Sequence, residues 1–286
     1  MRRGREARAA APGTMNKVTD GATAPAPARV GFLTEPPHWE PSPKWVRVWF
    51  AGVIIADSKR AMLLWEPPRP TPTYYFPLDD VRTDMLQPSD HTRPSQAMGE
   101  ATYWNVVAGS RRADQAAWTY RKPPNGAPQL SSHVAFKWDM MDAWFEEDDE
   151  AFVHPRDPHH RIDVLNSSRH VRVEVEGVTV AESTRPRLLF ETALLVRYYI
   201  PKLDVRMELL RPSNTVTRCP YKGSANHWDF ENGGTHVADV AWTYHLPAPE
   251  VATIADLVAF YNERVDAIYV DGELQPAPAT PWSRTR

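Results

Sequence analysis

The sequence predicts two tandem copies of one small, mostly β domain. Residues 46–66 (VRVWFAGVIIADSKRAMLLWE) and 171–191 (VRVEVEGVTVAESTRPRLLFE) agree at about half of their positions. After a one-residue slip the match continues, with YYFPLDDVRTDMLQPS (74–89) aligned to YYIPKLDVRMELLRPS (198–213). Because solenoid units have only about 20–50 residues, a repeat this long is a whole domain. The length of 286 residues also fits about two domains.

Alternating apolar and polar residues open each copy. In the second copy, Val171, Val173 and Val175 alternate with charged residues, and Gly177 interrupts the pattern before the next apolar stretch. A period of two with a glycine break predicts a β-hairpin that buries one face. Further strands are predicted in both copies by short β-rich segments such as LLWE (63–66), YYFP (74–77) and AWTY (117–120 and 241–244).

One helix is expected near the end of each copy. In the second copy, one helix face is predicted by the i, i+3, i+4, i+7 spacing of Ile254, Leu257, Val258 and Tyr261. Residues 267–270 then predict a returning strand, and the Asp271-Gly272 dipeptide is typical of a hairpin turn. The expected fold class is mostly β with minor α.

Composition divides the chain into five parts. Residues 1–44 are rich in Pro and Ala and predict a disordered tail, and a second tail is expected at 276–286. The two copies are expected at 45–151 and 170–275, on either side of a linker at 152–169 that is rich in Pro, Asp, His and Ser. Because fused copies of a domain often reproduce a two-fold dimer, we expect a pseudo-dimer within one chain.

Composition and charge argue against several partners. The net charge of −3 leaves no broad basic surface for a phosphate backbone, so no nucleic acid partner is expected. No apolar run approaches the roughly 18 residues of a membrane helix, so no membrane partner is expected. The single cysteine, Cys219, excludes an internal disulfide and a zinc site with two thiolates, and fits a cytoplasmic protein. We expect no metal and no cofactor; the alternative metal ligands are the linker residues His154, His159 and His160.

A set of motifs spread over both copies is similar to that of a known family. The set comprises the leading hairpin, S-x-R-x-x-L-L-W-E (58–66), Y-Y-F-P-x-x-D-V-R (74–82), P-S-D-H-T (88–92), C-P-Y-K-G-x-A-x-x-W (219–228) and A-W-x-Y. Together the motifs resemble the domain of unknown function 427 (DUF427) family, over about 45–150 and 170–275. The resemblance implies a β-tent-like fold of curved, crossing sheets. Some β-tent relatives bind zinc through cysteine pairs and others hold small ligands in aromatic pockets, and the family is sometimes labelled a nucleotidyltransferase.

The two copies depart from the family pattern in complementary ways. The first copy has PSDHT (88–92) but reads RPSQAMGEATYW (93–104) where the cysteine motif should follow. The second copy has TRCPYKGSANHW (217–228) but PSNTV (212–216) in place of PSDHT. If a site needs both halves of the pattern in one domain, both copies are impaired. If the copies pack as a pseudo-dimer, one composite site survives.

The candidate ligand-binding residues of the second copy are Lys222, Cys219, Glu191, Arg206 and Tyr199. Cys219 is either a small buried residue or a nucleophile whose pKa is lowered by Lys222 or His227. Lys222 lies in a Pro-to-Gly turn, where it either presents its charge to an anion or simply occupies a surface turn. A thiol, an ammonium, a carboxylate and a guanidinium among aromatic residues are typical of a small-molecule pocket. We therefore expect these side chains at the rim of one pocket.

The first copy contributes the candidates Glu66, Arg82, Tyr75 and His91. Glu66 and Glu191 end matching apolar runs, and we expect Arg82 and Arg206 to pair with them, in a structural ion pair or in a ligand-binding pair. His91 either titrates near neutral pH or belongs to a capped turn. Because this copy lacks the cysteine and the lysine, its pocket is expected to bind more weakly or not at all.

The sequence is compatible with three functions. A module that binds a nucleotide- or metabolite-like small molecule is the leading hypothesis. The alternatives are an enzyme of the nucleotidyltransferase-labelled type, acting on a nucleotide or phosphorylated metabolite, and a structural or scaffolding protein. Against the enzyme, the chain has no Gly-Ser followed by Asp-x-Asp, no P-loop and no dinucleotide fingerprint. Asp79 and Asp80 are adjacent, so on a strand their side chains would point to opposite faces.

Overall fold

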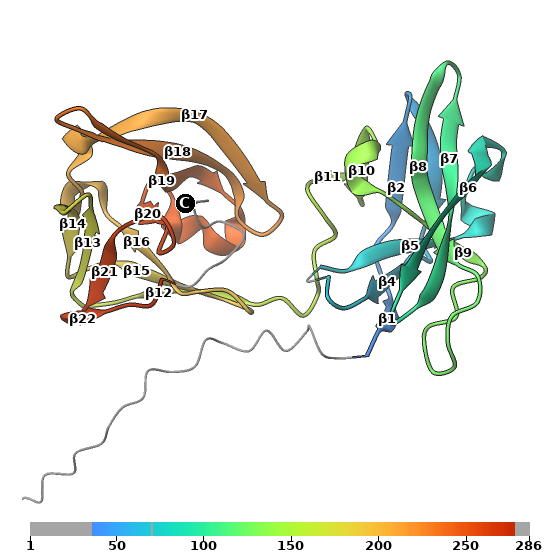
Figure 1. The fold of residues 1–286 in the computed structure, drawn as a ribbon, viewed down its shortest axis with the longest axis horizontal. Coiled ribbons are helices and arrows are strands. Elements are labelled where there is room, and N and C mark those ends of the chain that lie inside the picture. The colour runs from blue at the N-terminus through green and yellow to red at the C-terminus, as the bar shows by residue number, and fades with distance from the viewer. Residues whose placement is uncertain (1–35, 70, 278–286) are drawn as a thin grey trace, which may run out of the picture.

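The computed structural model describes residues 36–69 and 71–277, which fold into two similar halves (Figure 1). Within these residues each half has a seven-stranded and a four-stranded sheet, and every strand pairing is antiparallel. No described strand of one half pairs with a strand of the other. The mostly β class and the two-domain organisation predicted from the sequence are confirmed.

The first half spans β1 to β11. Its seven-stranded sheet has the order β1 (His38–Pro41), β4 (Met62–Trp65), β5 (Thr73–Pro77), β9 (His133–Phe136), β8 (Arg111–Tyr120), β7 (Gly99–Ala108), β6 (Leu86–Ser95). Its four-stranded sheet has the order β11 (Asp149–Ala151), β10 (Ala143–Glu146), β2 (Val46–Phe50), β3 (Val53–Ser58). Single 3₁₀ turns occur at η2 (Leu78–Asp80), η3 (Thr83–Met85) and η4 (Trp138–Met140).

The second half repeats this arrangement. Its seven-stranded sheet has the order β12 (Ile162–Asn166), β15 (Arg187–Glu191), β16 (Arg197–Ile200), β20 (Val258–Phe260), β19 (Thr235–Pro247), β18 (Gly223–Asn232), β17 (Leu210–Cys219). Its four-stranded sheet has the order β14 (Val178–Ser183), β13 (Val171–Val175), β21 (Ala267–Val270), β22 (Glu273–Leu274). The 3₁₀ segments are η5 (Lys202–Asp204), η6 (Met207–Leu209) and η7 (Pro249–Ile254).

The predicted hairpins form as the residue pattern indicates. Val171, Val173 and Val175 on β13 are at most 1% exposed and pack in the core of the second half. Glu176 and Gly177 both have positive φ, +49° and +70°, as the two central residues of a tight hairpin turn require. The strand predicted at 267–270 is β21, and the Asp271-Gly272 turn joins it to β22.

The larger sheet of each half is covered on both faces. In the second half, Tyr198 and Ile200 on β16 pack into the main core between the two sheets, whereas Tyr199 between them packs on the opposite face. This alternation follows from the two-residue period of a strand. Tyr199 joins an outer cluster with Leu189, Trp242, Tyr244 and four further residues. The outer cluster lies beneath the candidate site.

Two of the predicted boundaries are wrong. His38–Pro41, placed in the N-terminal tail, forms β1, and Ile162–Asn166, placed in the linker, forms β12. Both strands lie at an edge of their sheet, where a strand tolerates proline and polar residues because only one side is paired. β1 (HWEP) contains proline and a charged residue, and β12 (IDVLN) is short and closely follows the Pro- and His-rich stretch 153–160, so neither strand stands out from unstructured sequence. Most of the predicted N-terminal tail and nearly all of the C-terminal one lie outside the described residues.

The helix predicted around residues 254–261 is also wrong. The segment is the 3₁₀ helix η7 followed by β20, whose Val258 pairs with both Ile200 and Thr243. Val258 faces the main core and Ala259 the outer cluster, so β20 is apolar on both faces. The apolar residues of a 3₁₀ turn and of the short strand that follows it therefore have the same spacing as one face of an α-helix.

No helix among the described residues is long and apolar enough to cross a membrane.

Candidate functional site

A cavity of about 1,100 Å³ opens over the outer cluster of the second half. Its walls come from the second half, from the connecting segment (residues 152–161) and from the edge of the first half around Trp65. Four of the five candidates of the second copy line this cavity: Lys222, Cys219, Glu191 and Tyr199. The structure thus brings the thiol, the ammonium and the carboxylate together, as the sequence analysis expected.

The turn between β17 and β18 places Lys222 at the cavity. Cys219 pairs with Gly223 at the end of the two strands, and the Lys222 N–H donates to the Cys219 carbonyl at 3.3 Å. Gly223 has φ +97°, and a Cβ there would lie 3.2 Å from the Leu246 carbonyl oxygen. The positive φ and the close approach of the neighbouring strand together favour glycine at this position. The Ala248 N–H donates to the Lys222 carbonyl at 3.1 Å, which fixes the turn from the other side.

Glu191 is the most buried charged group of this set. Its carboxylate accepts from the Lys222 ammonium at 2.5 Å and from His160 Nε2 at 3.0 Å, and the Glu191 side chain is only 4% exposed. Burial by itself would raise the pKa of Glu191. The hydrogen bond from His160 and the nearby charge of Lys222 outweigh burial and hold this pKa below its ordinary value. The site therefore contains a carboxylate that stays ionised.

Aromatic rings surround this pair. Tyr221 stacks on His160 with ring centres 4.1 Å apart, and Tyr199 accepts a hydrogen bond from Trp242 Nε1 at 3.2 Å. Burial raises the pKa values of Tyr199, Tyr221 and Tyr244 well above the ordinary value. Their hydroxyl groups are therefore neutral hydrogen-bonding groups at physiological pH.

The deeper wall holds a cation and a histidine. The guanidinium of Arg197, a residue only 9% exposed, donates to Asn262 at 2.9 Å and to Glu263 at 2.8 Å. His227 contacts Thr217 through Nε2 at 2.9 Å, and its buried Nδ1 has no partner among the described residues. Burial lowers the pKa of His227, so the ring is neutral near pH 7.

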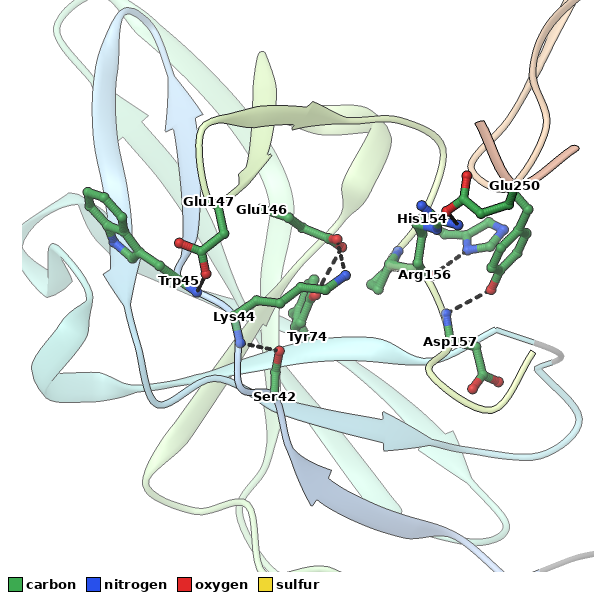
Figure 2. Close-up of polar contacts among 12 residues, drawn as sticks. Ser42, Lys44, Trp45, Tyr74, Glu146, Glu147, His154, Arg156, Asp157 and Glu250 are labelled. Carbon is green, nitrogen blue, oxygen red and sulfur yellow. Dashed lines mark hydrogen bonds and ion pairs between the residues drawn. The ribbon is translucent and has the colours of Figure 1, made fainter. Parts of the chain in front are cut away.

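The connecting segment ties the first half to this site. Figure 2 shows Arg156 beside Glu250 of the second half, and the two side chains pair at 2.8 Å. The carboxylate of Asp157 accepts from Trp65 Nε1 at 2.9 Å, while its backbone N–H donates to the Tyr221 hydroxyl at 2.7 Å. Asp157 therefore links a tryptophan of the first half to a tyrosine of the second. The linker prediction treated this segment as lying outside the domains, but it forms part of the cavity wall.

The expected pairing of Glu66 with Arg82 and of Glu191 with Arg206 is wrong. Arg82 pairs with Asp84 at 2.8 Å and Arg206 with Glu208 at 2.9 Å, each two residues further along the chain and exposed to solvent. Both arginines directly precede a 3₁₀ turn, which directs them to the acidic residue within that turn. Neither arginine lines the cavity.

The candidates of the first copy have a different environment. Glu66 accepts hydrogen bonds from Ser95 Oγ at 2.6 Å and from Tyr120 at 2.7 Å. Ser95 is the counterpart of Cys219, and Met98, the counterpart of Lys222, is fully buried. Tyr75 is 1% exposed within the outer cluster of its own half.

His91 is exposed on β6, where its ring lies edge-on to Tyr103 with centres 4.8 Å apart. It lies in a strand pairing that contains a register shift, and its N–H donates to Ser89 Oγ at 3.2 Å. It does not line the cavity. These contacts are those of a strand irregularity with a local side-chain cap.

Several residues of the site were not identified from the sequence. The sequence marks His160 only as an alternative metal ligand, it places Asp157 in the predicted linker, and it does not single out Arg197 or Tyr221. The only signal was the position of Tyr221 inside the cysteine motif, between Cys219 and Lys222. Contacts across more than 60 residues, such as that of Asp157 with Tyr221, leave no pattern in a single sequence. Among the described residues, no group of three or more His, Cys, Asp or Glu side chains could hold a metal ion.

The repeated sheets and the motifs around this cavity define a tandem of one β domain. The profile of a family described as a domain of unknown function (DUF427) matches residues 38–147 and 163–271. The chain therefore belongs to the DUF427 family and contains two copies of its domain. The matched ranges include β1 and all but the first residue of β12, in agreement with the structure. No curated protein matches the chain.

Proposed function

We propose that this chain binds a small, nucleotide- or metabolite-like molecule in the cavity of its second half. The observation that carries the proposal is the group formed by Lys222, Glu191 and His160. These side chains are 12%, 4% and 15% exposed, and all three line a cavity of about 1,100 Å³. Ligand sites are typically concave, largely apolar, and equipped with a few convergent polar groups.

The surrounding rings indicate the kind of ligand. Tyr199, Trp242 and Tyr244 belong to the outer cluster under the cavity, and Tyr221 and Trp65 form part of the cavity wall. Aromatic side chains bind flat rings by stacking and edge contacts worth about 1 kcal/mol each. A flat ring that carries hydrogen-bonding substituents is the ligand that suits these walls.

The partners of the acidic residues favour binding over phosphoryl transfer. A transferase of nucleotides needs carboxylates available for Mg²⁺. Here Glu191 is bound to Lys222 and His160, and Asp239 accepts from Ser213 at 2.7 Å and from Thr215 at 2.9 Å. The third acidic residue of the cavity wall, Asp157, accepts from Trp65. We therefore propose a binding module in preference to an enzyme of the nucleotidyltransferase-labelled type.

A thermal-shift screen over nucleosides, nucleotides and aromatic metabolites tests the proposal, because a ligand that binds only the folded state raises the unfolding temperature. Cys219 then locates the ligand, since it is the only cysteine of the chain and lines the cavity. We expect each stabilising compound to slow the reaction of Cys219 with a maleimide.

The control is a Cys219→Ser, Asp148→Cys chain, whose new thiol lies at a position that is 93% exposed in the first half. Its reaction rate should be unchanged by the same compounds. The proposal is overturned if no compound raises the unfolding temperature, or if the compounds that do so leave the reactivity of Cys219 unchanged.

A further inference from the structure

The cavity wall contains cations from both halves of the chain. Among the described residues, five Arg or Lys residues and three Asp or Glu residues line it. Resting on the small-molecule function proposed above, we infer that the cavity is a composite site in which Arg69 of the first half and Arg218 of the second bind a phosphate group of the same ligand.

Arg69 is an exposed cation at the edge of the first half. Its guanidinium donates to Thr73 Oγ1 at 2.8 Å and lies 5.9 Å from the centre of the Trp118 ring. None of the described residues provides a carboxylate partner for it. A hydroxyl and a ring face position the guanidinium without neutralising it, so its charge is available to a ligand.

Arg218 is an exposed cation that the second half contributes to the cavity wall. It lies on β17 next to Cys219, and its guanidinium carbon is 4.7 Å from the centre of the Phe152 ring on the connecting segment. Here too, the described part of the chain offers no carboxylate within ion-pairing distance. Arginine presents several N–H donors in a planar fork that matches phosphate oxygens.

The neighbouring cations are already engaged. Lys222 is paired with Glu191, and Arg197 with Glu263. Their charges are largely compensated inside the protein, so these two pairs shape the cavity more than they attract an anion. The fifth cation, Arg264, is half-buried, donates to the Asp239 carbonyl at 3.0 Å and lies 4.3 Å from the centre of the Tyr261 ring. The exposed cations of the wall are therefore Arg69 and Arg218, one from each copy of the domain.

The connecting segment keeps the two arginines on one cavity. Asp157 joins Trp65 to Tyr221, and His159 contacts Glu40 at 2.9 Å, so the segment holds the edge of the first half against the second. Trp65 lies only four residues from Arg69 in the chain. A phosphate group that contacts both arginines therefore requires both copies of the domain in this arrangement, because each copy supplies only one of the two cations.

The test compares each nucleoside with its 5′-monophosphate, and inorganic phosphate alone, by calorimetric titration of the full chain. In the wild-type protein we expect the monophosphate to bind at least tenfold more tightly than the nucleoside and to lose affinity as the salt concentration rises. Arg69→Met and Arg218→Met should each weaken the monophosphate about tenfold while changing nucleoside affinity less than twofold. Inorganic phosphate should bind weakly, because it lacks the ring.

Arg121→Met is the matched control. Arg121 also lies near a tryptophan ring, 5.5 Å from the centre of Trp104, and donates to a threonine hydroxyl, but it does not line the cavity. Monophosphate affinity should be unchanged in this variant. If Arg218→Met weakens binding and Arg69→Met does not, the composite site is wrong, although the proposed function stands. Equal affinities for nucleoside and monophosphate overturn the phosphate assignment, whereas the absence of any Cys219-protecting ligand overturns the proposed function itself.

Discussion

The Lys222 ammonium lies 2.5 Å from a carboxylate oxygen of Glu191, and the two side chains are 12% and 4% exposed. At the matching positions of the first copy, Met98 is fully buried and Glu66 is bound by the hydroxyl groups of Ser95 and Tyr120. The two copies of the domain therefore stabilise a carboxylate at the end of a buried strand in two different ways. The second copy uses an ammonium and an imidazole, and the first uses neutral hydroxyl donors.

Replacing Lys222 with methionine should destabilise the protein. The variant leaves a buried carboxylate with His160 as its remaining partner, and breaking a buried pair costs about 3–5 kcal/mol. We expect a loss of roughly 3 kcal/mol in the free energy of unfolding, measured by urea denaturation at pH 7, because His160 still donates. The Lys222→Met, Glu191→Gln chain, which removes both charges, should recover part of this loss.

Arg82→Met serves as the control for this variant, since it breaks the exposed pair with Asp84. Surface pairs contribute little, so stability should not change measurably. An unchanged stability of Lys222→Met itself would contradict the structural role assigned to the pair. It would also mean that the Lys222 ammonium is available to bind an anionic ligand, which is one of the two interpretations of the turn motif.

Gly223→Ala should be more destabilising than Gly234→Ala. The two glycines have similar φ angles, +97° and +91°, so the backbone strain introduced by a side chain is comparable. Only at Gly223 would the new Cβ meet another atom, the Leu246 carbonyl oxygen at 3.2 Å. We expect Gly223→Ala to lose roughly 1 kcal/mol more in the free energy of unfolding, within the range of about 1–3 kcal/mol for local backbone strain. Equal losses in the two variants would show that the close approach of the strands is not tight.

Much of the fold could be predicted from the sequence because its signals are local or repeated. The Val171 hairpin follows from a two-residue period and a glycine turn, and the duplication follows from the self-similarity of the chain. The edge strands β1 and β12 could not be predicted in the same way. The proline of β1 and the charged residue in each strand are tolerated because only one side of an edge strand is paired, and the position at the edge is a tertiary condition.

The site could be predicted only where its residues share a motif. Cys219 and Lys222 lie in one turn, and the repeat indicates Glu191 because it ends an apolar run that matches the one ended by Glu66 in the first copy. The partners of Glu191 depend on packing: Arg206 binds the nearer Glu208, and His160 reaches Glu191 from the connecting segment. Because Arg206 directly precedes the 3₁₀ turn η6, Glu208 within that turn is its nearest acidic partner. The sequence pattern alone does not distinguish Glu208 from Glu191 as the partner.

Stability should fall as the pH drops below about 6.5. Burial lowers the pKa values of His133, His154 and His227 in the folded state, relative to an unfolded value near 6.5. The unfolded chain therefore binds more protons in this range, and the stability that these neutral rings contribute is present above pH 6.5 and lost as the pH falls toward the folded pKa values. Urea denaturation between pH 8 and 5.5 measures the effect, and His227→Gln should flatten the profile. A stability that stays constant or rises on acidification would contradict the burial of these rings.

Cys219→Ser should rescue Lys222→Met by recreating the arrangement of the first copy. There, the serine at the position of Cys219 donates to Glu66 at 2.6 Å, beside a buried methionine at the position of Lys222. Tyr244 stands where Tyr120 donates to Glu66, so the double variant offers Glu191 the same two hydroxyl groups. We expect the double variant to regain at least half of the stability lost in Lys222→Met, while Cys219→Ser alone changes stability little. Cys219→Ala in the same background supplies no hydroxyl and should give no rescue. If serine and alanine rescue equally, the recovery comes from packing at the turn, and the hydroxyl donors of the first copy do not explain how its carboxylate is stabilised.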